Sequence, residues 1–217
     1  MIMEIEFNSD SSGTQWLSGL VFDNSQFAHL EILPPAGRIV RIEDCQFLSC
    51  STSPGTCVIG RGVILNNVVF SDLNCGDAIR LSSEATLKRV VVKGSRPKAL
   101  IVQPEFEDHF KMTESMDTEY QLDITEFIGV VTIIGIRGKM VRKDSARHVT
   151  VHANWKDEVD WKGLGIGPFS YWKIFIKKLA VFNAEEGVFS LPDSSDKHYS
   201  ETMRERELIE KSGLHFD

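Results

Sequence analysis

The sequence Ile42-Glu43-Asp44-Cys45-Gln46-Phe47 decides the fold, because its pattern recurs along the first half of the chain. The pattern reads apolar, polar, polar, small or β-branched, variable, apolar. The other copies are Phe22-Asp23-Asn24-Ser25-Gln26-Phe27, Leu65-Asn66-Asn67-Val68-Val69-Phe70 and Leu87-Lys88-Arg89-Val90-Val91-Val92. From 22 the copies begin again at 42, 65 and 87, which gives offsets of 20, 23 and 22 residues. Self-similarity at that period predicts a solenoid.

The spacing within each copy is explained by the geometry of a β-coil. Alternate side chains of a strand face the same way, so Cys45 and Phe47 are predicted to share the inward face. The odd step from Ile42 to Cys45 requires a bend at Glu43-Asp44, and Asn or Asp suits a bend because both tolerate the left-handed region. Arg89 occupies this place in the last copy, so we expect a less regular corner there.

A second set of strands follows the repeated motif, with Gly and Pro at the corners between them. The predicted strands cover residues 29–32, 56–59, 78–81 and 99–102. The pattern resembles the right-handed parallel β-helix over residues 22–102. The resemblance implies about four stacked coils and a rod roughly 19 Å long.

The sequence is also compatible with two other folds. Apolar residues five apart, as in Phe22, Phe27 and Ile32, also resemble pentapeptide-repeat proteins, although the later offsets of 23 and 22 depart from that family. A β-sandwich or β-barrel is the other alternative.

Residues 104–217 are predicted to form an α+β capping region packed on residues 1–103, a solenoid whose own N-terminal cap is Met3–Phe7. The fold class is therefore mainly β. An acidic run opens the second half and is predicted to be a solvated loop or exposed helix; its carboxylates are Glu105, Glu107, Asp108, Glu114, Asp117, Glu119 and Asp123. Strands are predicted at Phe127–Ile136 and His148–His152, and helices from Ser170 to about Phe182 and from about Asp196 to Lys211.

Composition restricts the function. A net charge of −7 disfavours a general nucleic-acid binder, because contact with phosphates needs clustered Lys and Arg. The N-terminal residues lack a basic and apolar signal pattern, and no apolar run is long enough to span a bilayer. We therefore expect a soluble, cytoplasmic protein without a membrane partner.

No catalytic residue, metal site or cofactor is predicted. The four cysteines, Cys45, Cys50, Cys57 and Cys75, lack CxxC spacing and are predicted to be small buried side chains. His148 and His152 would lie roughly 13 Å apart on a strand, too far to share a metal. The glycine-rich residues 163–167 lack a phosphate-binding pattern and are predicted to be a loop.

Because no catalytic, metal or cofactor site is predicted and the net charge is negative, we expect a non-catalytic protein-binding module, such as an inhibitor or an immunity protein that neutralises a basic toxin. The predicted partner patch consists of Trp155, Asp157, Glu158, Asp160 and Trp161, since Trp is enriched at interface hot spots. The alternative interpretation is that both rings fill the core of the capping region.

Two other classes of function stay open. Many β-helix proteins act on carbohydrates, and a sugar-binding or carbohydrate-active face would use Asp72, Asp77, Arg80 and Lys88, with Arg89 beside them. The third class is a structural or assembly module that associates through its coil ends.

Overall fold

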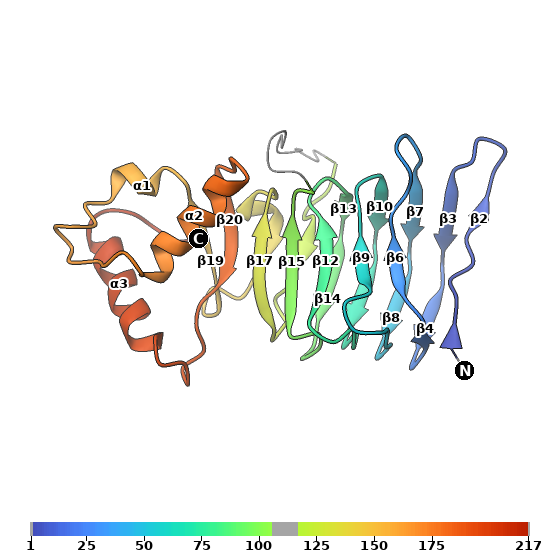
Figure 1. Ribbon diagram of the computed structural model, residues 1–217, viewed down its shortest axis with the longest axis horizontal. Coiled ribbons are helices and arrows are strands. Elements are labelled where there is room, and N and C mark those ends of the chain that lie inside the picture. Colours follow the sequence, from blue (N-terminus) through green and yellow to red (C-terminus); the bar gives the residue numbers. More distant parts are fainter. Residues whose placement is uncertain (1, 106–116, 217) are drawn as a thin grey trace.

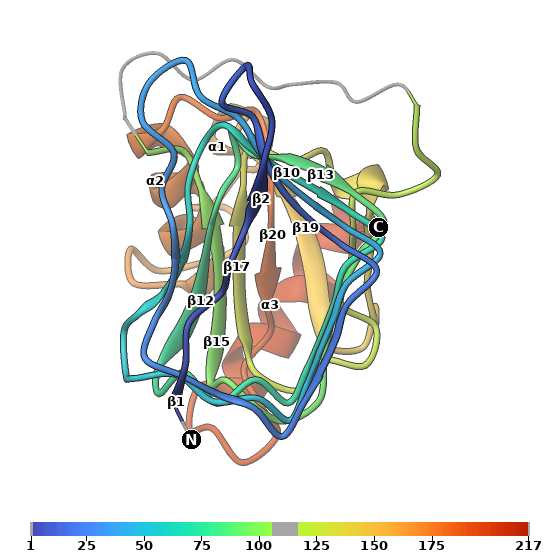
Figure 2. The same ribbon diagram turned by 90° about the vertical axis from the view of Figure 1, so that its right-hand side faces the viewer.

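The computed structural model describes residues 2–105 and 117–216 and shows a parallel β-solenoid of about six turns. Figure 1 shows the coils side by side along the long axis, with the helices gathered at the end away from the N-terminus. Figure 2 looks along the rod, where successive coils overlie one another. The predicted parallel β-helix and the mainly β class are confirmed.

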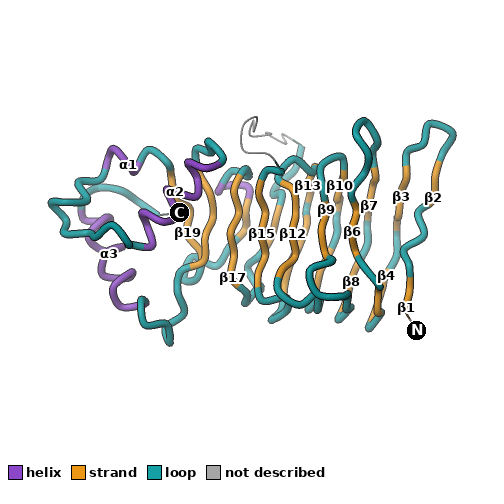
Figure 3. Tube along the Cα trace, in the orientation of Figure 1, coloured by secondary structure: helices purple, strands orange, loops and turns teal. Residues whose placement is uncertain are grey.

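Three long sheets run along the rod, and their strands appear as columns in Figure 3. In spatial order, the first sheet holds β13 (Thr86–Lys88), β10 (Val63–Asn66), β7 (Val40–Glu43), β3 (Gln15–Ser18) and β2 (Asn8–Ser9). The second sheet holds β18 (Val141–Arg142), β16 (Leu122–Asp123), β14 (Val90–Lys93), β11 (Val69–Ser71), β8 (Gln46–Leu48) and β4 (Val21–Asp23). The third holds β19 (His148–His152), β20 (Glu186–Ser190), β17 (Val130–Ile134), β15 (Ala99–Gln103), β12 (Ala78–Ser82), β9 (Cys57–Ile59) and β6 (Leu30–Ile32). A short pair, β1 (Ile2–Met3) and β5 (Gln26–Phe27), completes the N-terminal end.

The corner between the first and second sheets is a single residue with positive φ in each of the first four coils. Gly19, Asp44, Asn67 and Arg89 hold this place, with φ of 67°, 54°, 55° and 51°. The predicted bend at Asp44 and its Asn67 equivalent is confirmed. Arg89 keeps the same left-handed conformation, so the expected irregular corner is wrong, and the neighbouring coils impose the geometry on an unfavourable residue.

The register of the repeat is confirmed for three of the four copies. Leu65 pairs with both Ile42 and Leu87, and Phe70 pairs with Phe47. The first copy is out of register by five residues, because Phe22 pairs with Phe47 and Leu17 with Ile42. The second set of predicted strands is in register throughout, as Leu30 pairs with Cys57 and Ala78 with Ala99.

The solenoid continues beyond the predicted end near Val102 and has about six turns instead of about four. β17 pairs in parallel with β15, and β16 pairs with β14 and β18. The repeat pattern does not extend to the fifth coil: its described residues add no strand to the first sheet, and Leu122 pairs with Val90 instead of Leu87.

The interior of the rod is a continuous column of buried apolar side chains. The rings of Phe22, Phe47 and Phe70 stack along it, with centroids 5.0 and 5.2 Å apart. All four cysteines are buried and free, as predicted. Burial raises the pKa of the Cys45 and Cys50 thiols.

The cap, residues 143–216, closes the far end by reversing the strand direction. β20 pairs antiparallel with both β17 and β19. The helices are α1 (Trp155–Glu158), α2 (Tyr171–Val181) and α3 (Tyr199–Lys211), preceded by the short 3-10 helix η1 (Gly138–Met140). The two longer helices and the His148–His152 strand confirm the predictions, and the cap has its own core around Trp172.

Part of the acidic run lies outside the described residues, namely Glu107, Asp108 and Glu114. Asp117 is exposed. The other three make contacts within the fold: Glu105 accepts a hydrogen bond from the Arg61 N–H at 2.6 Å, and Arg142 contacts both Glu119 and Asp123.

Candidate functional site

Within the part of the chain that the structure describes, the third sheet has an open edge at the N-terminal end of the rod, where β6 pairs with β9 alone. The Leu30 N–H donates to the Thr56 carbonyl at 2.8 Å, and the Ile32 carbonyl accepts from the Gly60 N–H at 2.9 Å. Since backbone groups alternate along a strand, the N–H and C=O of Glu31 point away from β9. Neither has a partner strand among residues 2–105 and 117–216.

The N-terminal segment crosses the end of the rod opposite this edge without pairing to it. β1 pairs with β5, and β2 runs antiparallel to β3. Between these strands, Ile5 and Phe7 are half-buried against the solenoid core, as expected of residues that cover the coil end.

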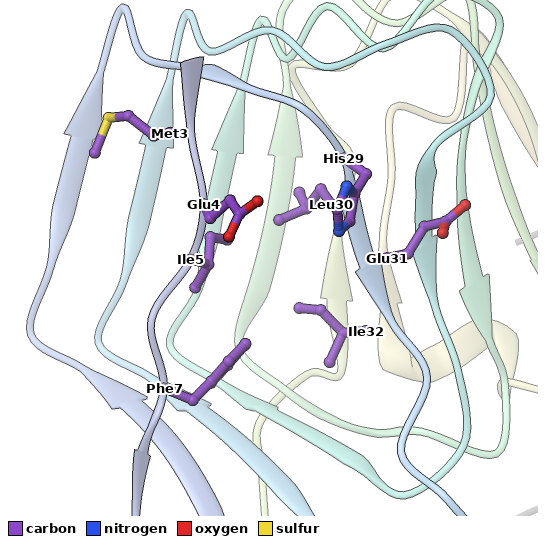
Figure 4. A pocket seen from close by; sticks show the side chains of 8 residues that line it. All are labelled: Met3, Glu4, Ile5, Phe7, His29, Leu30, Glu31 and Ile32. Carbon is purple, nitrogen blue, oxygen red and sulfur yellow. The ribbon is translucent and has the colours of Figure 1, made fainter. Parts of the chain in front are cut away.

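An edge cavity of about 230 Å³ separates residues 3–7 from residues 29–32. Its lining consists of Met3, Glu4, Ile5, Phe7, His29, Leu30, Glu31 and Ile32 (Figure 4). In Figure 4, Leu30 and Ile32 point from β6 toward the N-terminal segment, whereas Glu31 points away from it. The floor of the cavity is thus apolar and its outer side is acidic.

The acidic residues within residues 3–7 and 29–32 are Glu4, Glu6 and Glu31, and these two segments contain no Lys or Arg. Glu4, Glu6 and Glu31 are exposed, and no ion pair joins any of them to another residue of the described chain. The lining contains no Ser, Thr or Cys to serve as a nucleophile. An unpaired strand edge, an apolar floor and unneutralised carboxylates together suit the binding of an extended segment.

The predicted partner patch does not form one surface. Trp155 is 3% exposed and contacts Phe216 edge-on at 4.9 Å, so it belongs to the cap core, as the alternative interpretation expected. Trp161 is half-buried, with Lys173 above its ring. Asp157, Glu158 and Asp160 are exposed; Asp160 accepts from the Gly163 N–H and Glu158 from the Asn154 amide.

The four carbohydrate candidates do not share one face of the rod. Arg80 projects from β12 in the third sheet, with Asp77 just before that strand, and Lys88 ends β13 in the first sheet. Arg89 follows at the corner.

Asp72 lies at the corner that directly follows β11 of the second sheet. It lines a polar groove that spans several coils and has a volume of about 530 Å³. The groove residues are Asn24, Ser49, Ser51, Asp72, Asn74, Ser95 and Arg96.

The two histidines of β19 have different surroundings. His148 is buried, and neither of its ring nitrogens has a hydrogen-bond partner among the described residues. Burial, reinforced by Arg147, lowers its pKa to about 4. His152 Nδ1 lies 3.7 Å from the Glu186 carboxylate. Among the described residues, no group of three or more His, Cys, Asp or Glu side chains is placed to hold a metal ion.

Sequence reasoning missed the edge cavity because the cavity arises where two distant segments meet. The available signal was local: Leu30-Glu31-Ile32 alternates apolar and acidic residues, as does Glu4-Ile5-Glu6-Phe7. Alternation of this kind predicts one buried and one exposed face, and does not reveal an unpaired edge.

No helix in the described part of the chain is long and apolar enough to cross a membrane. Comparison of the chain with protein family models, curated proteins and solved structures found no match.

Proposed function

We propose that this chain is a non-catalytic protein-binding module that takes an extended basic segment of a partner protein along the open edge of β6. The observation that carries the proposal is the unpaired Glu31 backbone beside an apolar cavity of about 230 Å³. An inhibitor or immunity protein that neutralises a basic toxin would use such a surface.

Backbone pairing supplies the first part of the interaction. An exposed strand edge is a template for another strand, and proteins commonly cover or block such edges. Here residues 4–7 border the edge without pairing to it. A partner strand would bond to the N–H and C=O of Glu31 and continue the third sheet.

Side chains supply the selectivity. Leu30 and Ile32 are buried and face the cavity, so the partner's matching side chains are apolar. Glu31 faces outward, so the partner residue beside it is basic. The expected partner sequence therefore alternates apolar and basic residues, and Glu4 and Glu6 add to the same field.

A second copy of this chain fits the edge less well than a basic partner. Two N-terminal ends brought together would place Glu4, Glu6 and Glu31 against the same three carboxylates, and opposed like charges destabilise an interface. The assembly alternative is therefore less favoured by the charges at this end.

The test uses a short acetylated and amidated peptide in which valine and lysine alternate, followed by the amide NMR signals of Leu30, Glu31 and Ile32. We expect saturable shifts centred on β6. Replacing lysine by glutamate in the peptide should weaken binding by roughly tenfold or more, equivalent to about 1.4 kcal/mol. A peptide N-methylated on its pairing edge should not bind.

Matched variants separate charge from backbone pairing. Glu31→Gln should weaken the lysine peptide about three- to tenfold and leave the glutamate peptide no weaker. Glu126→Gln, an exposed carboxylate on the fifth coil, should change nothing. Equal binding of both peptides, or shifts that map away from β6, would refute the proposal.

A second candidate function, sugar binding, is favoured by the polar groove at Asp72, whose lining residues all carry hydrogen-bonding side chains, two of them the oppositely charged Asp72 and Arg96. Isothermal titration with neutral oligosaccharides tests it. Binding that is lost in Asn74→Ala and kept in Glu31→Gln would support this function, and heats no larger than dilution would exclude it.

A further inference from the structure

A second groove lies in the cap. Figure 1 shows the cap helices at the end of the rod away from the N-terminus, whose residues line the edge cavity. This cap groove has a volume of about 440 Å³ and lies between α2 and the loop that follows α1. Its apolar residues are Trp161, Pro168, Ile176 and Ala180, and its cationic residues are Lys156, Lys173 and Lys177.

The aromatic wall of the cap groove is held in place from both sides. Trp161 Nε1–H donates to the Lys156 carbonyl at 3.2 Å. Lys173 Nζ donates to the Ile166 carbonyl at 2.9 Å and lies 5.4 Å from the centroid of the Trp161 ring. A ligand would therefore meet a wall that is already ordered, which lowers the entropic cost of binding.

The charged residues that line the cap groove are all lysines. No ion pair to another described residue involves Lys156, Lys173 or Lys177. Three ammonium groups beside an apolar floor match a ligand with an apolar body and an anionic head. The volume falls in the range of about 300–1,000 Å³ that small-molecule sites occupy.

We propose that the cap groove binds a small amphipathic anion, an aromatic or aliphatic body that carries a carboxylate, sulfonate or phosphate. Its body would lie against Trp161 and Ile176, and its head group would face Lys156 and Lys177. This binding is independent of the edge cavity and does not rest on the protein-binding function.

An acidic protein is a poorer occupant of the cap groove than a small anion. Asp157 and Asp160 are exposed on the same stretch of chain as Lys156 and Trp161. A broad acidic surface would face these carboxylates as well as the lysines, and like charges across an interface are unfavourable. A small anion contacts the lysines alone.

The test compares 2-naphthoate with the neutral 2-naphthalenemethanol, followed by the methyl NMR signals of Ile176 and Ala180. We expect saturable shifts with both probes and about five- to tenfold tighter binding of naphthoate, lost at high salt. The double variant K156Q/K177Q should lose this preference while its affinity for the alcohol is unchanged. Lys178→Gln is the matched control, since Lys178 is on α2 but does not line the groove.

A blocking variant tests the location. Ala180 is exposed, so Ala180→Phe should fill the groove and abolish binding of both probes without unfolding the cap. The proposal is overturned by equal affinity for the two probes, by an equal effect of Lys178→Gln and K156Q/K177Q, or by shifts confined to the exposed Phe169. Shifts that saturate only with an acidic peptide would assign the groove to a macromolecule instead.

Discussion

Replacing Phe47 by Ala should cost this protein more stability than any other single truncation in the ring column of the second sheet. Phe47 is fully buried, and its ring stacks on Phe22 at 5.0 Å and on Phe70 at 5.2 Å. It therefore joins three successive coils. Phe22, at the open end of the column, is only half-buried.

The expected loss in the free energy of unfolding has two contributions, burial of the ring and its aromatic contacts. Truncating a buried Phe to Ala costs about 3–5 kcal/mol in transfer and cavity terms. Each aromatic contact adds about 0.5–1.5 kcal/mol beyond area burial, part of which the first figure already contains. We expect about 4–5 kcal/mol for Phe47→Ala and about 2 kcal/mol for Phe22→Ala, because the latter ring is partly solvated.

Urea unfolding followed by far-UV circular dichroism measures these losses, with Phe47→Leu as a control that keeps most of the apolar volume and should cost about 1–1.5 kcal/mol. Hydrogen exchange should accelerate first in β7 and β8, because a solenoid loses its coils through nearest-neighbour contacts. The reasoning is refuted if Phe47→Ala is no more destabilising than Phe22→Ala.

Three further variants test separate features of the fold. Arg89→Asn should stabilise by up to about 1 kcal/mol in urea unfolding, because Asn tolerates the left-handed corner at φ 51° better than Arg does. Ser170→Ala should cost about 1–2 kcal/mol by thermal unfolding, since Ser170 accepts from the Trp172 N–H and donates to Glu205 at 2.7 Å. Unfolded His148 binds a proton below about pH 6.5. Folded His148 does so only below about 4, so acidification favours the unfolded state. Wild type should lose about 2 kcal/mol between pH 7 and pH 5 relative to His148→Leu in urea titrations at each pH.

Each expectation has a contrary outcome. A destabilised Arg89→Asn would mean that the hydrogen bond from Arg89 to Asn66 at 2.8 Å outweighs the backbone strain. Ser195→Ala, in an exposed turn, is the control for Ser170 and should be close to neutral. Parallel pH profiles for wild type and His148→Leu would show that His148 is accessible to protons in the folded state.

The stacking of three coils could be predicted from the sequence, because equivalent positions of the repeat pair with one another in neighbouring coils. Ile42, Leu65 and Leu87 occupy one inward column, and their spacing alone aligned those coils. The first coil was misaligned because Phe22 has an apolar residue five positions away on both sides, Leu17 and Phe27, so the pattern fits either register. Only pairing with Phe47 decides between them.

The candidate sites could not be predicted in the same way. The edge cavity depends on where residues 3–7 cross the coil end, and the cap groove depends on how the loop carrying Trp161 packs on α2. Sequence spacing indicates which side chains share a face of one element. It does not indicate which elements meet, and Trp155 and Trp161, six positions apart, illustrate this with one ring in the core and the other at the surface.

The stacking of similar coils makes the distance between the two ends of the molecule adjustable. Each coil advances the rod by about 4.8 Å, so about six coils hold the edge cavity and the cap roughly 29 Å apart. A whole coil inserted or removed between equivalent corners, such as Asp44 and Asn67, would leave every remaining strand pairing in register. The number of coils therefore sets the length of the solenoid in fixed steps. Evolution or protein engineering can change that length while the edge cavity and the cap groove keep their lining residues.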